Sequence, residues 1–395
     1  MSYTPLTAAV DDPADLHRRE AQNAHARGDL LAAIAAQAAY LAMRETVGKL
    51  TAEDMLFLAL LQFQANEIAK SLAVIDHALA LFPAAAPLHE NRGVLLMTSG
   101  NPGEAIESCL RALECGGTSP NIHDCLADAS GRIGRLDDAI RHGRNALECK
   151  DRMFCAAPMV RITMPSLLAA PFNPHNPSEN VIAYTLWGNS QRYVIPLLEN
   201  LRLIPHLFPG WTARIYLDDT VPMIVQEEFV KLGAVVVKKT LPPGVPAHRR
   251  LLWRFAVSAD PAVRRFLVRD ADSLLSVKER VATDAWLASG YHFHVMRDFY
   301  THTDLMLAGM WGGVGGVLPE PDMLMGHFQG WRAEGNHVDQ DLLSELVWPS
   351  VRHHCLVHDS VFTGCLGSVP FPPYGALPPG QHIGENAYIR LIAGS

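Results

Sequence analysis

The feature that most constrains the fold is a 34-residue repeat in the first part of the chain. Gly100 and Gly134 are 34 positions apart, and so are Ala105 and Ala139. The same step separates three Ala-Leu pairs, at 78-79, 112-113 and 146-147, while Gly28 and Asn66 continue the series upstream with a slightly longer spacing. Glycine and asparagine suit a tight turn, and small alanines let two helices approach closely. The pattern predicts stacked pairs of helices.

This pattern resembles the tetratricopeptide repeat family, over residues 15–152. The first unit is degenerate, as terminal capping repeats often are. The resemblance implies a concave groove that binds a peptide or another protein. Packing on the second domain or formation of a homo-oligomer is an equally open alternative, because no aromatic or charged stripe in the repeats marks a ligand.

The composition changes near Cys155, where helical periodicity gives way to a stretch rich in proline and asparagine. The first residues are polar and include proline, which is typical of a loose arm. We therefore expect four parts: a flexible arm at 1–14, helical repeats at 15–155, a linker at 156–180 and a second domain at 181–395.

The net charge, the lengths of the apolar runs and the cysteine content argue against several classes of protein. The 395 residues carry a net charge of −8, which argues against nucleic acid as a partner. The sequence has no run of about 18 apolar residues and no signal-peptide layout, so we expect no membrane span and a cytoplasmic location. The seven cysteines are scattered without a CxxC motif, which favours reduced thiols over a disulfide framework.

The second domain alternates short apolar runs with helical stretches. Strands are expected at 181–187, 213–219, 234–239, 264–272 and 291–298, with helices between them. This alternation predicts an α/β domain with a mostly parallel sheet. Ligands of such sheets lie beyond the carboxyl ends of the strands. Gly188, Asp218, Asp270 and Asp272 stand at such ends.

Asp270 and Asp272 directly follow the apolar run Phe266-Leu267-Val268. Two acids at positions i and i+2 of an extended segment point the same way, and their repulsion is relieved by water or by a cation. Oxygen ligands suit Mg²⁺ or Mn²⁺, and phosphate groups can complete the coordination shell. A solvated turn is the simpler alternative for an isolated Asp-x-Asp.

The order of motifs resembles the DxD-containing, nucleotide-sugar glycosyltransferases of the GT-A fold. After the DxD come a glycine-rich segment at 307–317, the phrase NHVDQDLLSELVWP at 336–349 and VHDSVFTG at 357–364. The last two are similar to segments of the retaining branch that includes glycogenin, and several phrases also look like a set of uncharacterised bacterial glycosyltransferase-like proteins. The chain lacks that branch's late lysine and proline. The resemblance covers about 181–388.

The resemblance implies a role for individual residues. The metal ligands would be Asp270, Asp272 and a late histidine, with His358 as the candidate and His327, His337, His353, His354 and His382 as alternatives. The nucleotide and diphosphate would be held by Trp187, Gly188, Arg192, Asp218, Arg254 and Arg269. Asp339 and Gln340 would face the reaction centre, and Asp298 the sugar hydroxyls. Core packing, turn formation or a surface salt bridge is the alternative for each.

We therefore expect a metal-dependent glycosyltransferase that moves a sugar from a UDP- or GDP-sugar to a protein, peptide or glycan acceptor. The resemblance favours the retaining type, while an inverting enzyme with Asp339 or Asp341 as its base is the open alternative. Mn²⁺ or Mg²⁺ would be the cofactor, and the repeats would recruit the acceptor. One alternative is a scaffold whose second domain binds a nucleotide-sugar without turnover. Another is a nucleotidyltransferase, which would release pyrophosphate.

Overall fold

In the computed structural model the chain forms two compact units, residues 1–143 and 144–395. The structure describes residues 13–156, 158, 160–165, 171–330, 337–378 and 380–393. Most of the predicted arm, residues 1–12, and part of the predicted linker lie outside these ranges. No helix among the described residues is long and apolar enough to cross a membrane.

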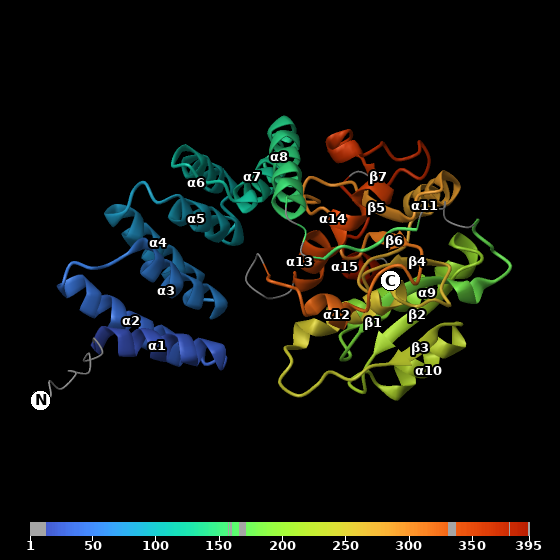
Figure 1. Cartoon of the computed structure of the whole chain (residues 1–395), viewed down its shortest axis with the longest axis horizontal. Helices are drawn as coiled ribbons and strands as arrows, with labels where there is room; N and C mark the ends of the chain where they lie inside the picture. The colour runs from blue at the N-terminus through green and yellow to red at the C-terminus, as the bar shows by residue number, and fades with distance from the viewer. Residues whose placement is uncertain are drawn as a thin grey trace, which may run out of the picture. The chain divides into compact units, whose positions relative to one another are not determined.

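The N-terminal part is an array of paired helices (Figure 1). Its helices are α1 (Pro13–Ala26), α2 (Leu30–Thr46), α3 (Ala52–Gln64), α4 (Ile68–Leu81), α5 (Ala86–Thr98), α6 (Pro102–Glu114), α7 (Pro120–Arg132) and α8 (Leu136–Cys155).

The repeat residues have the structural roles that the sequence predicts. Gly28, Asn66, Gly100 and Gly134 link the two helices of their pairs with φ values of 77°, 60°, 78° and 78°. This left-handed conformation favours glycine and, among other residues, asparagine. The repeated alanines 78, 105, 112, 139 and 146 are all fully buried, which lets neighbouring helices pack closely. The predicted array of helical pairs is confirmed.

The second unit is built on a seven-stranded sheet with the order β3-β2-β1-β4-β6-β5-β7. Neighbours pair in parallel except on both sides of β6, so the predicted mostly parallel α/β sheet is confirmed. The strands are β1 (Asn180–Leu186), β2 (Thr212–Leu217), β3 (Val235–Lys238), β4 (Arg265–Val268), β5 (Phe293–Arg297), β6 (Trp311–Gly313) and β7 (Cys355–Asp359).

Helices cover both faces of this sheet. The longer ones are α9 (Gln191–Leu207), α10 (Met223–Lys231), the 3₁₀ segment η2 (Ala247–Ser258) and α11 (Val277–Ser289). Shorter ones are η1 (Pro177–Glu179), α12 (Pro321–Met325), α13 (Val338–Leu342), the π-helical turn η3 (Leu343–Val347), α14 (Trp348–Val351), η4 (Arg352–His354), η5 (Cys365–Gly367) and α15 (Tyr388–Ala393).

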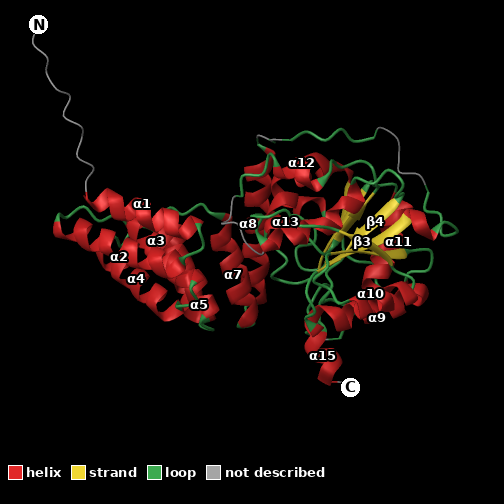
Figure 2. Cartoon of the chain, turned by 90° about the horizontal axis from the view of Figure 1, so that it is seen from below, coloured by secondary structure: helices red, strands yellow, loops and turns green. Residues whose placement is uncertain are grey.

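Each central strand contributes to two hydrophobic clusters. In β1, Val181 and Ala183 pack with η2, α13 and α14, whereas Ile182 and Tyr184 pack with α9, α10 and α11. Figure 2 shows α9 and α10 on one side of the strands and α13 on the other. A strand buried on both faces reads as a continuous apolar run, which is why β1 and β4 stand out in the sequence. Their carboxyl ends emerge at one edge of the sheet.

Candidate active site at the carboxyl edge of the sheet

The acidic pair lies directly after β4, at the edge where β1 and β2 also end, because these three strands are parallel. Asp270 forms an ion pair with Arg254 of η2, whose side chain is only 2% exposed. The other terminal nitrogen of Arg254 donates to Oδ2 of Asp339, in α13, at 2.9 Å. Arg254 thus joins the acidic pair to the Asp-Gln segment.

Asp339 is a buried carboxylate whose charge Arg254 balances. Burial raises its pKa above the usual value, and the Arg254 guanidinium opposes that rise. The Asp339 side chain also accepts from the main-chain N–H of Gln340 at 3.0 Å. The Gln340 amide lies 3.2 Å from Nδ1 of His337.

Asp272 is held by two other segments. Arg192 of α9 donates to its Oδ2 at 3.0 Å, and the Asn386 amide donates to the same oxygen at 2.8 Å. The main-chain N–H of Ala387 donates to the Asp272 carbonyl at 2.8 Å. Burial and the repulsion of Asp270 raise the pKa of Asp272, while Arg192 lowers it. The carboxylate repulsion expected from the sequence is therefore present, and arginines relieve part of it.

The acidic pair fits a hard divalent cation in donor type. The side-chain bonds described above engage Oδ1 of Asp270 and Oδ2 of Asp272. Each carboxylate therefore has a second oxygen to offer, and oxygen ligands are what Mg²⁺ and Mn²⁺ prefer. Arg192, whose side chain is 54% exposed, and the more buried Arg254 supply positive charge beside the pair.

The Asp270 carboxylate packs against Gly309, in the space that a side chain at position 309 would occupy. The sequence alone does not predict this contact. A Cβ atom at Gly309 would lie 1.9 Å from Oδ2 of Asp270. A larger residue at position 309 would therefore have to displace the Asp270 carboxylate or the backbone. The only available signal was the glycine-rich character of 307–317.

The ends of β1 and β2 form a second polar group at the same edge. Gly188 donates its N–H to the Thr220 hydroxyl at 2.7 Å, and Thr220 donates its own N–H to Asp218 at 3.1 Å. Arg250 donates to Asp218 at 2.9 Å. Although burial acts to raise it, bonds from Thr220 and Arg250 hold the pKa of Asp218 below its usual value. Trp187 is half-buried beside this group.

A cavity of about 370 Å³ lies beside the carboxyl end of β3. Lys239, Arg249, Trp253 and Glu320 are among its lining residues. It lies in the size range of small-molecule pockets, which is roughly 300–1,000 Å³. A pocket with basic, aromatic and acidic side chains can take a polar ligand with a flat ring.

Three predicted residues have side chains that lie apart from the acidic pair. Arg269 is buried, and its side chain pairs with Glu279 at 3.0 Å and donates to the Trp311 carbonyl at 3.2 Å. The reason is the strand geometry: Arg269 and Asp270 are adjacent in an extended segment, so their side chains point to opposite faces. Arg269 is therefore not available to hold a diphosphate, and this part of the prediction is corrected.

His358 lies on β7, which β5 and β6 separate from β4. Three strand spacings amount to roughly 14 Å, too far for one cation to be shared with the acidic pair. Its Nδ1 instead lies 2.8 Å from Nε2 of His294, and burial lowers its pKa to about 4. The prediction that His358 is the third metal ligand is therefore corrected.

Asp298 also lies in a group of its own. Its side chain is 1% exposed and accepts from Lys278 at 2.9 Å, so it does not present itself to a sugar. The expected contact with sugar hydroxyls is corrected accordingly. Its neighbours include His302 and His382.

Comparisons with known proteins bear mainly on the repeats. No family model matches the sequence. A stretch of 90 residues is 31% identical to the TPR repeat-containing thioredoxin TTL4 of Arabidopsis thaliana; it covers 23% of this chain and 13% of that protein. This similarity and the helical pairs support tetratricopeptide-type repeats in the N-terminal part.

Solved structures show weaker likenesses. An O-GlcNAc transferase variant of Thermobaculum terrenum matches with a TM-score of 0.38 and 21% identity, over 61% of this chain and 43% of that one. MamA matches with a TM-score of 0.33 and 18% identity, over 37% of this chain and 82% of that one. We draw nothing about function from either.

Proposed function

We propose that the second unit is a metal-dependent glycosyltransferase that uses a nucleotide-diphosphate sugar. One observation carries the proposal: Arg254 forms ion pairs with both Asp270 and Asp339. The DxD and the Asp-Gln segment, which the motif order assigns to one site, are thus linked by one buried guanidinium at the carboxyl edge of the sheet.

The proposed roles follow from the positions of the side chains. Asp270 and Asp272 would hold Mn²⁺ or Mg²⁺ through the carboxylate oxygens that the arginines leave, and such a cation would supply positive charge beside a departing diphosphate. Arg192, largely exposed beside Asp272, contacts a phosphate oxygen. Gly188, Asp218 and Trp187, at the ends of β1 and β2, would bind the nucleoside.

Asp339 and Gln340 orient the sugar in this proposal. Asp339 is buried and tied to Arg254, so positioning of a hydroxyl suits it better than removal of a proton from an acceptor in solvent. The similarity of the segment 336–349 to the retaining branch that includes glycogenin supports retention of the anomeric configuration. The configuration of the product, read by proton NMR, tests that part separately.

We further propose that the repeats recruit a protein or peptide acceptor. A cavity of about 370 Å³ in the repeats is lined by Arg18, Gln37, Glu53, Asp54, Phe57 and Asn91, among others. Its mixed charges and one aromatic ring suit a polar peptide. Binding of a second copy of the chain, or of a glycan, is the competing use of these repeats.

The test is a donor assay with UDP- and GDP-sugars and Mn²⁺, which measures release of the nucleoside diphosphate. Wild type should consume one donor, and Asp272→Asn should lose most of that activity while keeping its fold. Asp219→Asn is the matched control, because Asp219 also stands at this edge but is 96% exposed and pairs only with Lys238 among the described ion pairs. Equal activity of wild type and Asp272→Asn would contradict the proposal.

A second candidate function rests on the same ion pairs. Arg254 and Arg192 already neutralise both carboxylates of the DxD, as expected if the domain binds a nucleotide-sugar without turnover. In that case a donor should raise the melting temperature of the protein, yet no donor should be hydrolysed or transferred over a wide panel of acceptors. Pyrophosphate release from a nucleoside triphosphate would instead indicate a nucleotidyltransferase.

A further inference from the structure

The segment just before α15 reaches back to the DxD. Asn386 lies 114 positions after Asp272 and donates its side-chain amide to Oδ2 of that residue at 2.8 Å. The next residue, Ala387, is fully buried, and its main-chain N–H donates to the Asp272 carbonyl at 2.8 Å. One side-chain bond and one main-chain bond therefore join this segment to the acidic pair.

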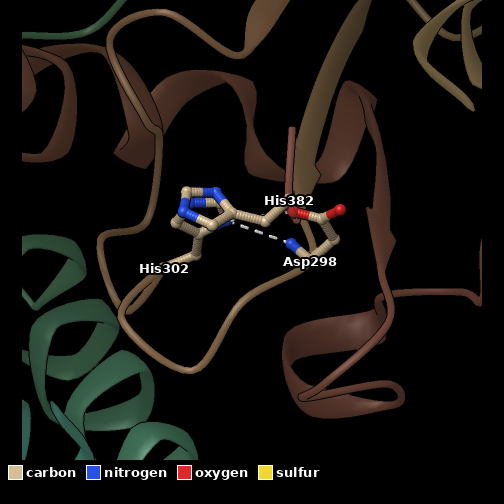
Figure 3. Close-up of side chains that lie close together, drawn as sticks. All are labelled: Asp298, His302 and His382. Carbon is tan, nitrogen blue, oxygen red and sulfur yellow. Dashed lines mark hydrogen bonds and ion pairs between the residues drawn. The ribbon is translucent and has the colours of Figure 1, made fainter. Parts of the chain in front are cut away.

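The same segment is also held at the end of β5. Ile383 donates its N–H to the Asp298 carboxylate, at 3.2 Å from either oxygen. The ring of His382 packs edge-on against that of His302, with ring centroids 4.9 Å apart (Figure 3). These contacts fix the backbone three residues before Asn386, so the position of the amide is set from both sides.

The contacts of Asn386 also define how its amide is oriented. The amide oxygen accepts from the main-chain N–H of Tyr388 at 3.0 Å, which forms an Asx-turn at the start of α15. An ionised Asp272 carboxylate can only accept, so the NH₂ group has to face it. Asparagine thus supplies an acceptor for the turn and a donor for the acid in one side chain.

The Asp272 carboxylate consequently has one oxygen engaged and one open. Its Oδ2 accepts from Asn386, and from Nε and Nη2 of Arg192 at 3.2 and 3.0 Å. None of the hydrogen bonds among the described residues engages Oδ1. Carboxylates that bind a metal are typically hydrogen-bonded in this way, and these outer partners orient the ligand oxygen.

Asn386 and Arg192 act differently on this oxygen. The Arg192 guanidinium is charged and its side chain is 54% exposed, so it competes with a cation for the charge of the carboxylate. In the function proposed above it contacts a phosphate oxygen. The Asn386 amide is neutral, so it can orient the carboxylate without cancelling its charge.

We propose that Asn386 is a positioning residue of the DxD, which holds Oδ2 of Asp272 and so leaves Oδ1 directed to the divalent cation. This inference rests on the function proposed above, because it requires a cation at the DxD. Coupling between two sites is reciprocal, so the Asn386 contact should be stronger when a cation is bound. Residues 380–393 should then be better ordered.

The test is Mn²⁺ binding by the full-length protein, measured by titration calorimetry without donor or acceptor. Asn386→Ala should weaken binding about 10–100-fold, the usual effect of losing an outer partner of a metal ligand. Asn386→Ser keeps an acceptor for the turn at Tyr388 but is too short to reach Asp272, so it should lose as much. Gln381→Ala is the matched control, because Gln381 forms only a main-chain hydrogen bond among those described, and it should bind as wild type does.

Hydrogen exchange provides a second readout. Mn²⁺ should slow amide exchange in residues 380–393 of wild type, and should not do so in Asn386→Ala or Asn386→Ser. Wild-type affinity in Asn386→Ser would overturn the inference, because the turn alone would then explain this residue.

The outcomes separate this inference from the proposed reaction. If Asp272→Asn loses Mn²⁺ binding while both Asn386 variants keep it, the inference fails and the proposed function stands. If binding depends on Asn386 but no donor is consumed, the inference stands and the transfer reaction fails. A wild-type protein that binds no Mn²⁺ would contradict both.

Discussion

Gly309 leaves the space that the Asp270 carboxylate fills. In Gly309→Ala the new methyl group would meet Oδ2 of Asp270 at 1.9 Å, so the carboxylate or the backbone must move. Overpacking of this kind costs about 1–3 kcal/mol of unfolding free energy. We expect a loss of that size in urea denaturation, and a weakened Asp270–Arg254 ion pair.

The double variant Gly309→Ala/Asp270→Ala isolates this contact. Because alanine at position 270 removes the carboxylate, the second substitution should relieve the clash. The two changes should therefore couple by about 1 kcal/mol or more in a double-mutant cycle. Strict additivity of the two losses would show that Gly309 is not needed for the carboxylate.

Arg254 compensates a buried carboxylate, so its removal should be costly. Arg254→Met leaves Asp339 buried without its partner, and breaking such a pair costs about 3–5 kcal/mol. Arg264→Met is the control, since Arg264 and Glu179 are 39% and 33% exposed and form a surface pair. The control should cost no more than about 1 kcal/mol. Equal losses in the two variants would refute the buried-pair interpretation.

The pH dependence of Arg254→Met has a defined sign. Burial raises the pKa of Asp339 and Arg254 opposes the rise, so the pKa should rise further in the variant. The folded variant then keeps a proton that the unfolded chain releases above about pH 4. Its stability falls as the pH rises through this range. The deficit relative to wild type should be largest at neutral pH and shrink toward pH 4.

Most residues around the DxD could be predicted from the sequence, because they belong to recognisable motifs or to the helices beside them. Asp270, Asp272, Arg254, Arg192 and Asp339 are indeed close together in the structure. The sequence does not predict Asn386, because a contact with Asp272 across 114 positions leaves no local pattern. The orientation of the Arg269 side chain is predictable from the sequence, because adjacent residues of an extended segment face opposite ways.

Helices α5 and α6 approach closely at Gly93. A Cβ atom there would lie 2.4 Å from Sγ of Cys109 and 3.5 Å from Sγ of Cys125. Gly93→Ala should therefore destabilise the repeats by about 1–3 kcal/mol, despite the better helix propensity of alanine. Thermal unfolding followed by circular dichroism at the helix band measures this loss.

Two further variants test the cause. Adding Cys109→Ala to Gly93→Ala makes room and should restore part of the stability. Gly103→Ala in α6 is the matched control, because a Cβ there meets nothing within 4 Å. The control should be neutral or slightly stabilising. A loss in Gly103→Ala as large as that in Gly93→Ala would rule out the packing explanation.

Elements with a strong period or a long apolar run were the most predictable. The helical pairs and the strands β1, β2 and β4 follow directly from such patterns. The sequence pattern predicts no strand at β7 (Cys355–Asp359), the second part of which falls in the histidine motif at 357–364. This strand is short and mixes polar with apolar residues, and its burial comes from pairing with β5. Such tertiary pairing is not encoded in a five-residue window.

The two compact units divide after Gly143, within α8, whereas the sequence predicts the change of domain at residue 155. The second half of α8 contacts the second unit. Lys150 is fully buried and donates to Asp304 at 2.8 Å. Asp151 accepts from Trp348 at 2.7 Å and from Arg352 at 2.8 Å. Through these polar contacts, residues 144–155 belong to the second unit.

A fragment that begins at Leu136 and keeps all of α8 should therefore be much more stable than one that begins at residue 156. Loss of Lys150 alone leaves the Asp304 carboxylate, 11% exposed, without this partner, at a cost of about 3–5 kcal/mol. Tryptophan fluorescence in urea compares the two fragments, and the full-length Lys150→Met variant shows how much of the difference this ion pair explains. If both fragments unfold at the same urea concentration, α8 contributes nothing to the stability of the α/β unit and belongs to the repeats alone, which would contradict this prediction.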